Sequence, residues 1–370
     1  MNKKLMMAAM SFALLACGAD TASVVIPETE EPRETPVVSM ADLPEVYYAL
    51  SRTIDGYLNL QEFNGVALVA SSDSILLLEA YGMADVGQKI PLETDSKFQI
   101  ASITKPFTAI AILQLAEEGL LALNQPISDF LPGVLNGEHI TLHHLLTHSS
   151  GLFAGDSLAD YSYFASSAEL IEPAFGNFAL HFWEPGSTTI YSNLGYHLLG
   201  VVIEQVSGLA LEEFFQQRIF DVAQMEDSGL NMPGAPIEKM AIAYTGFAAG
   251  NDPAPVFHPS TGFAAGGIHS TAYDLFNFGQ AIYGNALLNP ESTQLMFTPN
   301  YNMGLTYYGY GWFLEPRGIR GGFTHPGVLA GWRTLFLGHQ DNKVTVILLS
   351  NQDEGDLMTM GVTIAQLILE

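Results

Sequence analysis

The chain is poor in positive charge. Its 370 residues include 13 lysines and arginines against 39 aspartates and glutamates, so the formal net charge is −26. Proteins that bind nucleic acids carry basic surfaces that neutralise phosphates, so this composition argues against a nucleic-acid partner. A surface this acidic is well solvated and repels other acidic molecules. Positions 106–217 contain neither lysine nor arginine, which leaves Lys105 isolated in an apolar stretch.

Cysteine is almost absent as well. The single Cys17 excludes disulfides within the chain. It ends the stretch MNKKLMMAAMSFALLAC, in which two lysines precede an apolar run that is too short to span a bilayer. The final LLAC resembles a bacterial lipobox, whose cysteine is lipidated and becomes the first residue of the mature protein. We therefore expect a lipoprotein signal peptide at 1–16 and an exported, membrane-anchored protein that faces the periplasm or the cell surface. The alternative is an ordinary secretory signal with an incidental cysteine.

The rest of the chain divides into a linker and a folded part. Residues 17–40 combine three prolines with several glutamates, which predicts a flexible acidic tether. Residues 41–370 predict one α+β domain, because β-rich runs at both of its ends enclose a helical middle. We expect an antiparallel sheet built from both termini (about 41–100 and 300–370) and flanked by helices. A mostly helical lobe (about 120–300) would complete the domain, with a ligand cleft between the two lobes.

Several individual elements can be placed. The sequence predicts a helix over 42–60 and two strands joined by a Ser/Asp turn at 64–82. Helical patterns at 193–208 and 270–284 each end in glycine, the residue that commonly terminates a helix. A last helix is expected over 356–369.

Several catalytic signatures are missing. The chain has no G-x-S-x-G motif, which argues against an α/β-hydrolase nucleophile elbow, and no HExxH motif or phosphate-binding glycine loop. His139 and His143 have the i, i+4 spacing of zinc ligands on a helix, and so do His144 and His148. The leucines between them nevertheless predict a core helix. We therefore expect no metal and no other cofactor, and we expect His148 to satisfy backbone groups in the turn LLTHSSGL.

The stretch FQIASITKPFTAIAILQLAEEG carries the strongest chemical signal. Ser102 and Lys105 are three residues apart and so share one face of a helix. Pro106 belongs in the first turn of that helix, because proline lacks the N–H that later turns require. Residues 102–118 are apolar on nearly every side, which predicts a fully buried helix ending at Gly119. Burial would lower the pKa of the Lys105 amine, so that it could accept the proton of a nucleophilic Ser102. The alternative is a helix-capping serine with a surface lysine one turn later.

Four segments together carry a resemblance to a known family. They are YGMADVGQKIPLETDSKFQIASITKPFTA, LLTHSSGL, EPGSTTIYSNLGYHLLGVVIEQVSG and TGFAAGGIHSTAYDLFNF. From about 45 to 369 the chain resembles the serine β-lactamases and penicillin-binding proteins, in the branch of class C β-lactamases, DD-peptidases, D-aminopeptidases and related esterases. The resemblance implies a two-lobed fold and an acyl-enzyme formed on Ser102 of the S-x-x-K element.

The family's second element is Y-x-N, which Tyr191-Ser192-Asn193 matches. By resemblance, Tyr191 would share proton transfer with Lys105, and Asn193 would hold a substrate carbonyl. Asn193 could also be the N-cap of a helix over 194–207, and both roles could hold together.

The third element is normally Lys-Thr-Gly, which does not occur in this chain. His325-Pro326-Gly327 matches a His-x-Gly variant, and a rival is RGG at 320–322. By resemblance, Val328 would supply the second oxyanion N–H, and Gly327 would let the substrate approach the backbone.

The departure from Lys-Thr-Gly bears on the substrate. In the family, the lysine and the threonine hydroxyl bind the carboxylate of a penicillin or a terminal D-alanine. Pro326 has neither a hydroxyl nor an N–H, and His325 is largely neutral near pH 7. We therefore expect a serine hydrolase that acts on uncharged esters or amides, a small molecule or a peptide. The alternatives are a D-alanyl-D-alanine carboxypeptidase or class C-like β-lactamase, and a catalytically silent member that binds a ligand. The sequence leaves the oligomeric state open.

Overall fold

The computed structural model describes residues 45–153, 166–175, 180–181, 183–231, 234, 236–245, 252–256, 258–304 and 306–370. The predicted signal peptide (1–16), Cys17 and the predicted tether (17–40) lie outside the described residues. Within the described part, no single helix is long and apolar enough to cross a membrane. One helix pair bent by 81°, Asn193–Ser207 with Leu211–Ala223, meets the criteria of length and composition.

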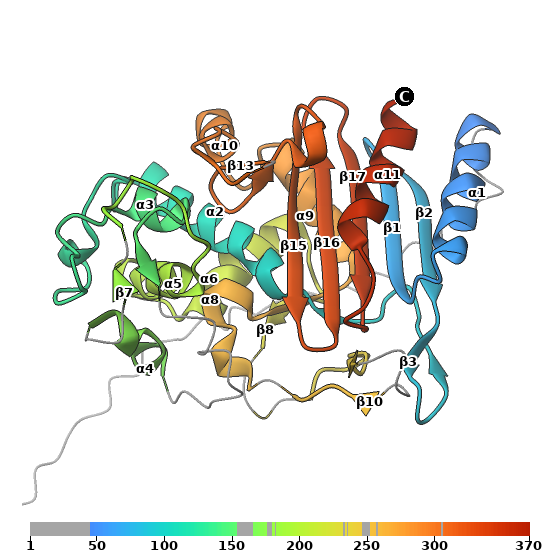
Figure 1. Ribbon diagram of the computed structural model, residues 1–370, viewed down its shortest axis with the longest axis horizontal. Coiled ribbons are helices and arrows are strands. Elements are labelled where there is room, and N and C mark those ends of the chain that lie inside the picture. The colour runs from blue at the N-terminus through green and yellow to red at the C-terminus, as the bar shows by residue number, and fades with distance from the viewer. Residues whose placement is uncertain are drawn as a thin grey trace, which may run out of the picture. The chain divides into compact units, whose positions relative to one another are not determined.

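An eight-stranded antiparallel sheet joins the two ends of the chain (Figure 1). Its strand order is β12-β13-β14-β15-β16-β17-β1-β2. The strands are β1 (Gly65–Ser71), β2 (Ser74–Tyr81), β12 (Tyr301–Asn302), β13 (Tyr307–Tyr308), β14 (Phe313–Leu314), β15 (Gly322–Leu329), β16 (Trp332–His339) and β17 (Val344–Ser350). The first strand pairs with the last, with Val66 opposite Leu349. The predicted antiparallel sheet built from both termini is thereby confirmed, as are the two strands at 64–82.

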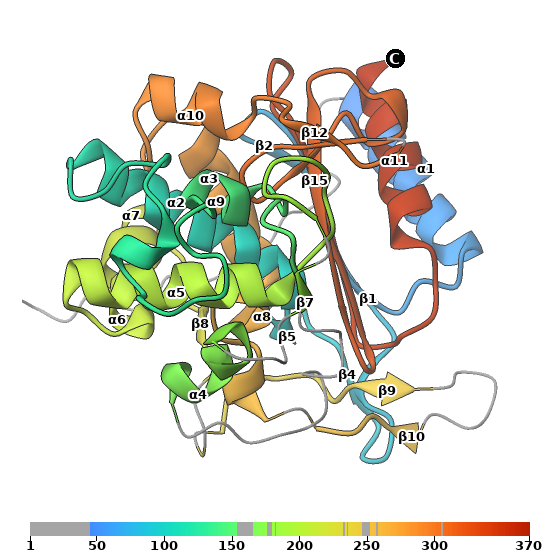
Figure 2. The ribbon, with the colours of Figure 1, turned by 60° about the vertical axis from the view of Figure 1, so that its left-hand side comes forward.

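Each face of the sheet packs on its own helices. Successive side chains of a strand point to opposite faces, so alternate residues enter different cores. Val69, Leu335 and Leu348 contact the cluster that includes α1 (Glu45–Leu60) and α11 (Leu357–Leu369). Phe336 and Leu349 belong to the larger cluster on the opposite face, where the remaining helices lie. Figure 2 shows α1 and α11 on one side of the sheet and the helical lobe on the other.

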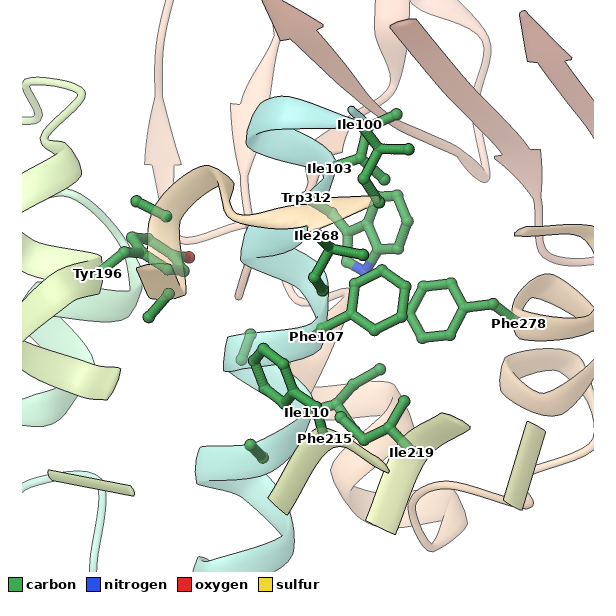
Figure 3. Close-up of a cluster of buried hydrophobic side chains, with 14 of the residues drawn as sticks. Ile100, Ile103, Phe107, Ile110, Tyr196, Phe215, Ile219, Ile268, Phe278 and Trp312 are labelled. Atoms are coloured by element: carbon green, nitrogen blue, oxygen red, sulfur yellow. The ribbon is translucent and has the colours of Figure 1, made fainter. Parts of the chain in front are cut away.

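Helix α2 (Thr104–Glu117) runs through the centre of the larger core. Every residue from Thr104 to Leu115 is buried, in agreement with the prediction of a helix buried on all sides. Phe107 stacks on Phe278 with ring centroids 4.0 Å apart (Figure 3). Gly119, with φ +71°, follows the last helical turn and adopts the left-handed conformation that glycine tolerates best.

Beyond the large sheet, the described residues form further helices and small sheets. Helices α5 (Asn193–Ser207) and α9 (Ala272–Tyr283) confirm two of the predicted elements, and α5 ends at the left-handed Gly208. The other helices on this side of the sheet are α3 (Leu142–Leu146), α4 (Ser167–Ile171), α6 (Leu211–Phe215), α7 (Asp221–Ala223), α8 (Phe263–Gly266) and α10 (Pro290–Met296). The small sheets are β3 (Met83–Asp85) with β4 (Ile90–Pro91), β6 (Leu152–Phe153) with β7 (Leu180–His181), β9 (Tyr244–Thr245) with β10 (Asp252–Pro253), and β5 (Phe98–Gln99) with β11 (Ile268–Ser270) and β8 (Gly229–Leu230).

Candidate active site

A sharp turn presents Ser102 at the start of α2. Strand β5 leads into Ile100, whose N–H donates to Ile268 O at 3.0 Å. Ala101 then takes a left-handed conformation with φ +50°, which costs an alanine about 1–2 kcal/mol. Ser102 occupies the second position of a 3₁₀ turn, Ala101–Ile103, whose other two residues are buried, whereas Ser102 is half-buried. The first N–H groups of such a turn have no partner within it, so the Ser102 N–H is suited to bind an oxyanion.

Lys105 follows Ser102 by about one helical turn and is fully buried. Its Nζ lies 3.2 Å from Ser102 Oγ. Shorter bonds, both of 2.8 Å, run from Nζ to Asn193 Oδ1 and to the backbone oxygen of Ala265. A neutral amine has two N–H donors and one lone pair. In the neutral form, the two short bonds would use both donors, which would leave the lone pair for the hydroxyl proton of Ser102.

The surroundings of Lys105 favour this neutral form. Burial lowers the pKa of Lys105 well below its ordinary value, because an ammonium group loses its hydration in the core. None of the ion pairs within the described residues involves Lys105. Among the described residues, the atoms at hydrogen-bond distance from its Nζ are the uncharged oxygens of Ser102, Asn193 and Ala265. The alternative of a capping serine with a surface lysine is therefore wrong.

Asn193 is the first residue of α5 but does not cap it. The capping side chain is that of Ser192, whose Oγ accepts from the Gly195 N–H at 3.3 Å. The expectation that Asn193 is the N-cap is wrong, because its Oδ1 is turned toward Lys105. With Oδ1 engaged there, the amide NH₂ of the exposed Asn193 is directed elsewhere. Contact of this group with a substrate carbonyl stays a prediction.

The aromatic ring of Tyr191 lies next to the Lys105 amine. The ring centroid lies 4.7 Å from Lys105 Nζ. The same ring packs against the His148 ring, with centroids 4.4 Å apart, and stacks with the Phe313 ring at a centroid separation of 6.4 Å. The structure thus brings Ser102, Lys105, Tyr191 and Asn193 together, and a share of Tyr191 in proton transfer stays a prediction.

His325 lies inside the protein rather than at its surface. The residue is 1% exposed. Its Nδ1 lies 2.8 Å from the backbone oxygen of Pro326 and must donate to it, so Nε2 is the acceptor for the Tyr308 hydroxyl at 3.3 Å. Burial, reinforced by the nearby Lys105, lowers the pKa of His325 to about 3. A neutral ring therefore occupies the position that the resemblance assigns to the lysine of Lys-Thr-Gly, and its burial gives no support to direct substrate contact.

Gly327 allows β15 to approach the turn that carries Ser102. A Cβ atom at this position would lie 2.2 Å from Ile100 O and 2.1 Å from Thr334 Oγ1. The Thr334 hydroxyl also donates to Ile100 O at 2.9 Å. Close packing therefore requires glycine at this position. The approach of a substrate to the backbone, which was the expected reason for this glycine, stays a prediction. The rival RGG segment ends at Gly322, which pairs with His339 at the far end of the β15–β16 hairpin, and it is therefore wrong.

The backbone of Val328 faces the open edge of β15. Glu315 donates to Gly322 O, so Gly322 directs its backbone groups toward β14. These directions alternate along an antiparallel strand, and Val328 follows Gly322 by an even number of residues. Strand β14 pairs only as far as Thr324. The N–H of Val328 consequently points beyond the end of β14, as its predicted oxyanion role requires. Pro326 faces the same open edge, where its missing N–H costs no strand pairing.

Three of the four histidines that have zinc-ligand spacing make structural contacts. His143 Nδ1 lies 2.8 Å from the Tyr310 hydroxyl, and His144 Nδ1 accepts from the Thr141 N–H at 3.2 Å. His148 Nδ1 accepts from the backbone N–H of Ser192 at 3.1 Å, which confirms that this side chain satisfies a backbone group. Across the residues that are described, no group of three His, Cys, Asp or Glu side chains could hold a metal ion.

One contact of the site was not anticipated from the sequence. The backbone oxygen of Ala265 in α8 binds Lys105, and the neighbouring oxygen of Ala264 accepts from the Thr108 hydroxyl at 2.6 Å. The glycines of the segment TGFAAGG predict only a tight turn beside the cleft. A backbone acceptor leaves no side-chain signature, so no residue type could have pointed to it.

Comparison with known proteins identifies the family. Residues 50–367 match the family model described as beta-lactamase, so the chain belongs to the beta-lactamase family. It is 31% identical to penicillin-binding protein 4* of Bacillus subtilis over 312 residues, which are 79% of this chain and 69% of that protein. It is 29% identical to esterase EstB of Burkholderia gladioli over 272 residues, 61% of this chain and 67% of that protein.

A solved structure agrees with this assignment. The penicillin-binding protein of Bacillus halodurans superimposes with a TM-score of 0.76 at 29% identity, covering 85% of this chain and 98% of that one. The predicted family and the α+β fold are thus confirmed. The protein is a serine hydrolase related to the β-lactamases.

Proposed function

We propose that this hydrolase forms an acyl-enzyme on Ser102 and acts on uncharged esters or amides, with Lys105 as the general base. The observation that carries the proposal is the bonding of the Lys105 amine. Its Nζ lies 2.8 Å from Asn193 Oδ1 and from Ala265 O and 3.2 Å from Ser102 Oγ, so a neutral amine that donates to the first two oxygens would direct its lone pair to Ser102. No cofactor is needed, because the nucleophile, base and oxyanion donors all come from the chain.

The reaction proceeds in two halves. As Ser102 Oγ bonds to the substrate carbonyl carbon, its proton passes to Lys105 Nζ, and the N–H groups of Ser102 and Val328 stabilise the charge on the carbonyl oxygen. Collapse of this intermediate breaks the bond to the leaving group, which takes the proton from Nζ and departs as an alcohol or amine. Water then adds to the acyl carbon, and the acid is released as Ser102 recovers its proton. Tyr191 assists these proton transfers.

The preference for uncharged substrates rests on the third element. His325 is neutral and buried, and Pro326 offers neither a hydroxyl nor an N–H. Strand β15, Gly322–Leu329, contains no lysine or arginine that could bind a carboxylate. The relatives include both an esterase and a penicillin-binding protein, and the missing cation favours chemistry of the esterase kind. D-Alanyl-D-alanine peptides and β-lactams, which carry a carboxylate, are the second candidate class.

A panel of substrates, assayed with the folded part of the protein (residues 41–370), tests this proposal. We expect p-nitrophenyl acetate and butyrate to be hydrolysed with a higher kcat/KM than nitrocefin or D-alanyl-D-alanine peptides. A fluorophosphonate probe should label the protein, and Ser102→Ala should abolish both labelling and turnover. Nitrocefin turnover that matches the esters would contradict the substrate class. Failure to label would contradict the acyl-enzyme itself and leave a catalytically silent binding protein.

We also propose that Cys17 is lipidated and anchors the protein in a bacterial membrane. The support is the sequence alone, in which the only cysteine follows Leu-Leu-Ala at the end of a short apolar run. Expression with an alkyne-tagged fatty acid should label the full-length chain and place it in the membrane fraction. Cys17→Ser should remove the label and release the protein. A label that persists in Cys17→Ser would contradict this assignment.

A further inference from the structure

His148 makes three contacts with the segment that carries Tyr191. Its backbone oxygen accepts from the N–H of Ile190 at 2.9 Å. Its ring Nδ1 accepts from the N–H of Ser192 at 3.1 Å. Between these two bonds, the imidazole ring packs on the Tyr191 ring, with centroids 4.4 Å apart and planes inclined by 35°. One residue therefore holds the backbone on both sides of Tyr191 and also contacts its ring.

His148 is itself held firmly. The residue is 2% exposed and follows α3 in the left-handed conformation, with φ +57°. Besides Tyr191, its ring contacts the rings of Tyr308 and Tyr196, with centroid separations of 4.7 and 5.0 Å. The Tyr196 hydroxyl donates to Leu146 O at 2.8 Å, which ties this aromatic group back to α3. Its burial and its contacts with three aromatic rings restrict the movement of the His148 ring.

The hydrogen bonds define the chemical form of the ring. Because Nδ1 accepts from a backbone N–H, the proton of the neutral imidazole is on Nε2. Nε2 is buried and has no hydrogen-bond partner among the described residues. Burial, with the neighbouring Lys105 as a smaller cause, keeps the pKa of His148 well below its ordinary value. The ring is consequently an uncharged acceptor and does not compete with Lys105 for a proton near neutral pH.

We propose that His148 is a positioning residue that sets the location of Tyr191 beside Lys105. This inference rests on the proposed function, in which Tyr191 assists proton transfer. The Tyr191 ring lies 4.7 Å from Lys105 Nζ, so a small movement of residues 190–192 would change that spacing directly. Misplacing a group by about 1 Å can cost about 100-fold in rate. His148 does not contact the reacting atoms in this role.

A pair of substitutions of similar shape tests the acceptor, although leucine tolerates the left-handed backbone at position 148 less well than asparagine. Asn and Leu have the same branched shape, and Asn Oδ1 occupies the position of His Nδ1, so His148→Asn keeps the bond to Ser192 and His148→Leu removes it. Asparagine also tolerates the left-handed backbone. We expect kcat for p-nitrophenyl butyrate to fall by about 100-fold in His148→Leu, with little change in KM. His148→Asn should retain most of the wild-type kcat.

A double-mutant cycle with Tyr191→Phe separates positioning from mere stability. Phenylalanine keeps the ring contact with His148 but lacks the hydroxyl. If His148 acts through Tyr191, His148→Leu should cost little further kcat in the Tyr191→Phe background, although it should lower Tm equally in both backgrounds. An equal loss of kcat in both backgrounds would overturn the inference and leave the proposed function intact. Wild-type activity in Tyr191→Phe would overturn both the inference and the role of Tyr191, whereas Ser102 labelling would still report the acyl-enzyme.

Discussion

Replacing Lys105 by methionine tests the chemistry most directly. Methionine fills nearly the same volume without a polar atom, so Lys105→Met removes the base and leaves the core packed. General acid–base catalysis contributes about 10²–10⁴-fold to rate. We therefore expect kcat/KM for p-nitrophenyl butyrate to fall by about that factor, which corresponds to about 3–5 kcal/mol of transition-state stabilisation. Fluorophosphonate labelling of Ser102 should slow in parallel.

Stability should change far less than activity in this variant. The substitution leaves Asn193 Oδ1 and Ala265 O without a donor, which is destabilising. It also removes a buried amine whose desolvation is unfavourable. Because these effects oppose each other, Tm should change little, and circular dichroism during heating will measure it.

The pH profile and an arginine control complete the test. Only the free amine can accept a proton, so wild-type kcat/KM should fall as the pH drops through the lowered pKa of Lys105 and should be constant above it. Lys105→Arg keeps hydrogen-bond donors but stays charged at every accessible pH, so it should be as inactive as the methionine variant. Activity within tenfold of wild type in either variant, or an ammonium at position 105 in the resting enzyme at pH 8, would refute the reasoning.

Three further predictions concern Asn193, Gly327 and Asp274. Asn193→Asp places a carboxylate 2.8 Å from the Lys105 amine, so the acid limb of the kcat/KM profile should move to higher pH, and an unmoved limb would contradict the neutral base. Gly327→Ala should cost about 3 kcal/mol of unfolding free energy in urea denaturation, since its Cβ would overlap a backbone oxygen. The control Gly56→Ala, on an open face of α1, should gain about 0.5–1 kcal/mol, and equal effects of the two substitutions would disprove the packing argument. Burial raises the pKa of Asp274 to about 7, so its contribution to stability is complete below about pH 4 and is lost as the pH rises to 7. The Tm of Asp274→Asn minus that of the wild type should therefore increase between pH 4 and pH 7. A difference that stays constant over this range would exclude this titration.

The elements with the most uniform sequence were the easiest to predict. Helix α2 is apolar on all sides and starts with an early proline, so its burial and its end at Gly119 followed from composition and spacing. The strands at 64–82 and in the last third were similarly evident. Ser102 and Lys105 could be placed together because three residues of helix bring their side chains to one face.

The features that could not be predicted depend on contacts between distant segments. Ser192 and Asn193 are both good capping residues, and only the position of Lys105, 88 residues earlier, decides which of them turns inward. The packing of Gly327 against Ile100 O was not predictable, because the sequence does not show that these residues meet, and the role of Gly327 in substrate approach stays a prediction. The three contacts of His148 with residues 190–192 likewise appear only once the fold has brought α3 next to α5.

The pairing of β1 with β17 has a consequence for the synthesis of this protein. The first strand of the sheet lies between β2 and β17, a strand that is far away in the sequence, with Ala67 opposite Leu348. The turn before Ser102 likewise packs against β15 and β16, through Gly327 and Thr334. Such long-range pairings form slowly and late. We therefore expect a growing chain to complete its active site only after β17 has been translated, and truncation before β15 would leave the nucleophile without its support.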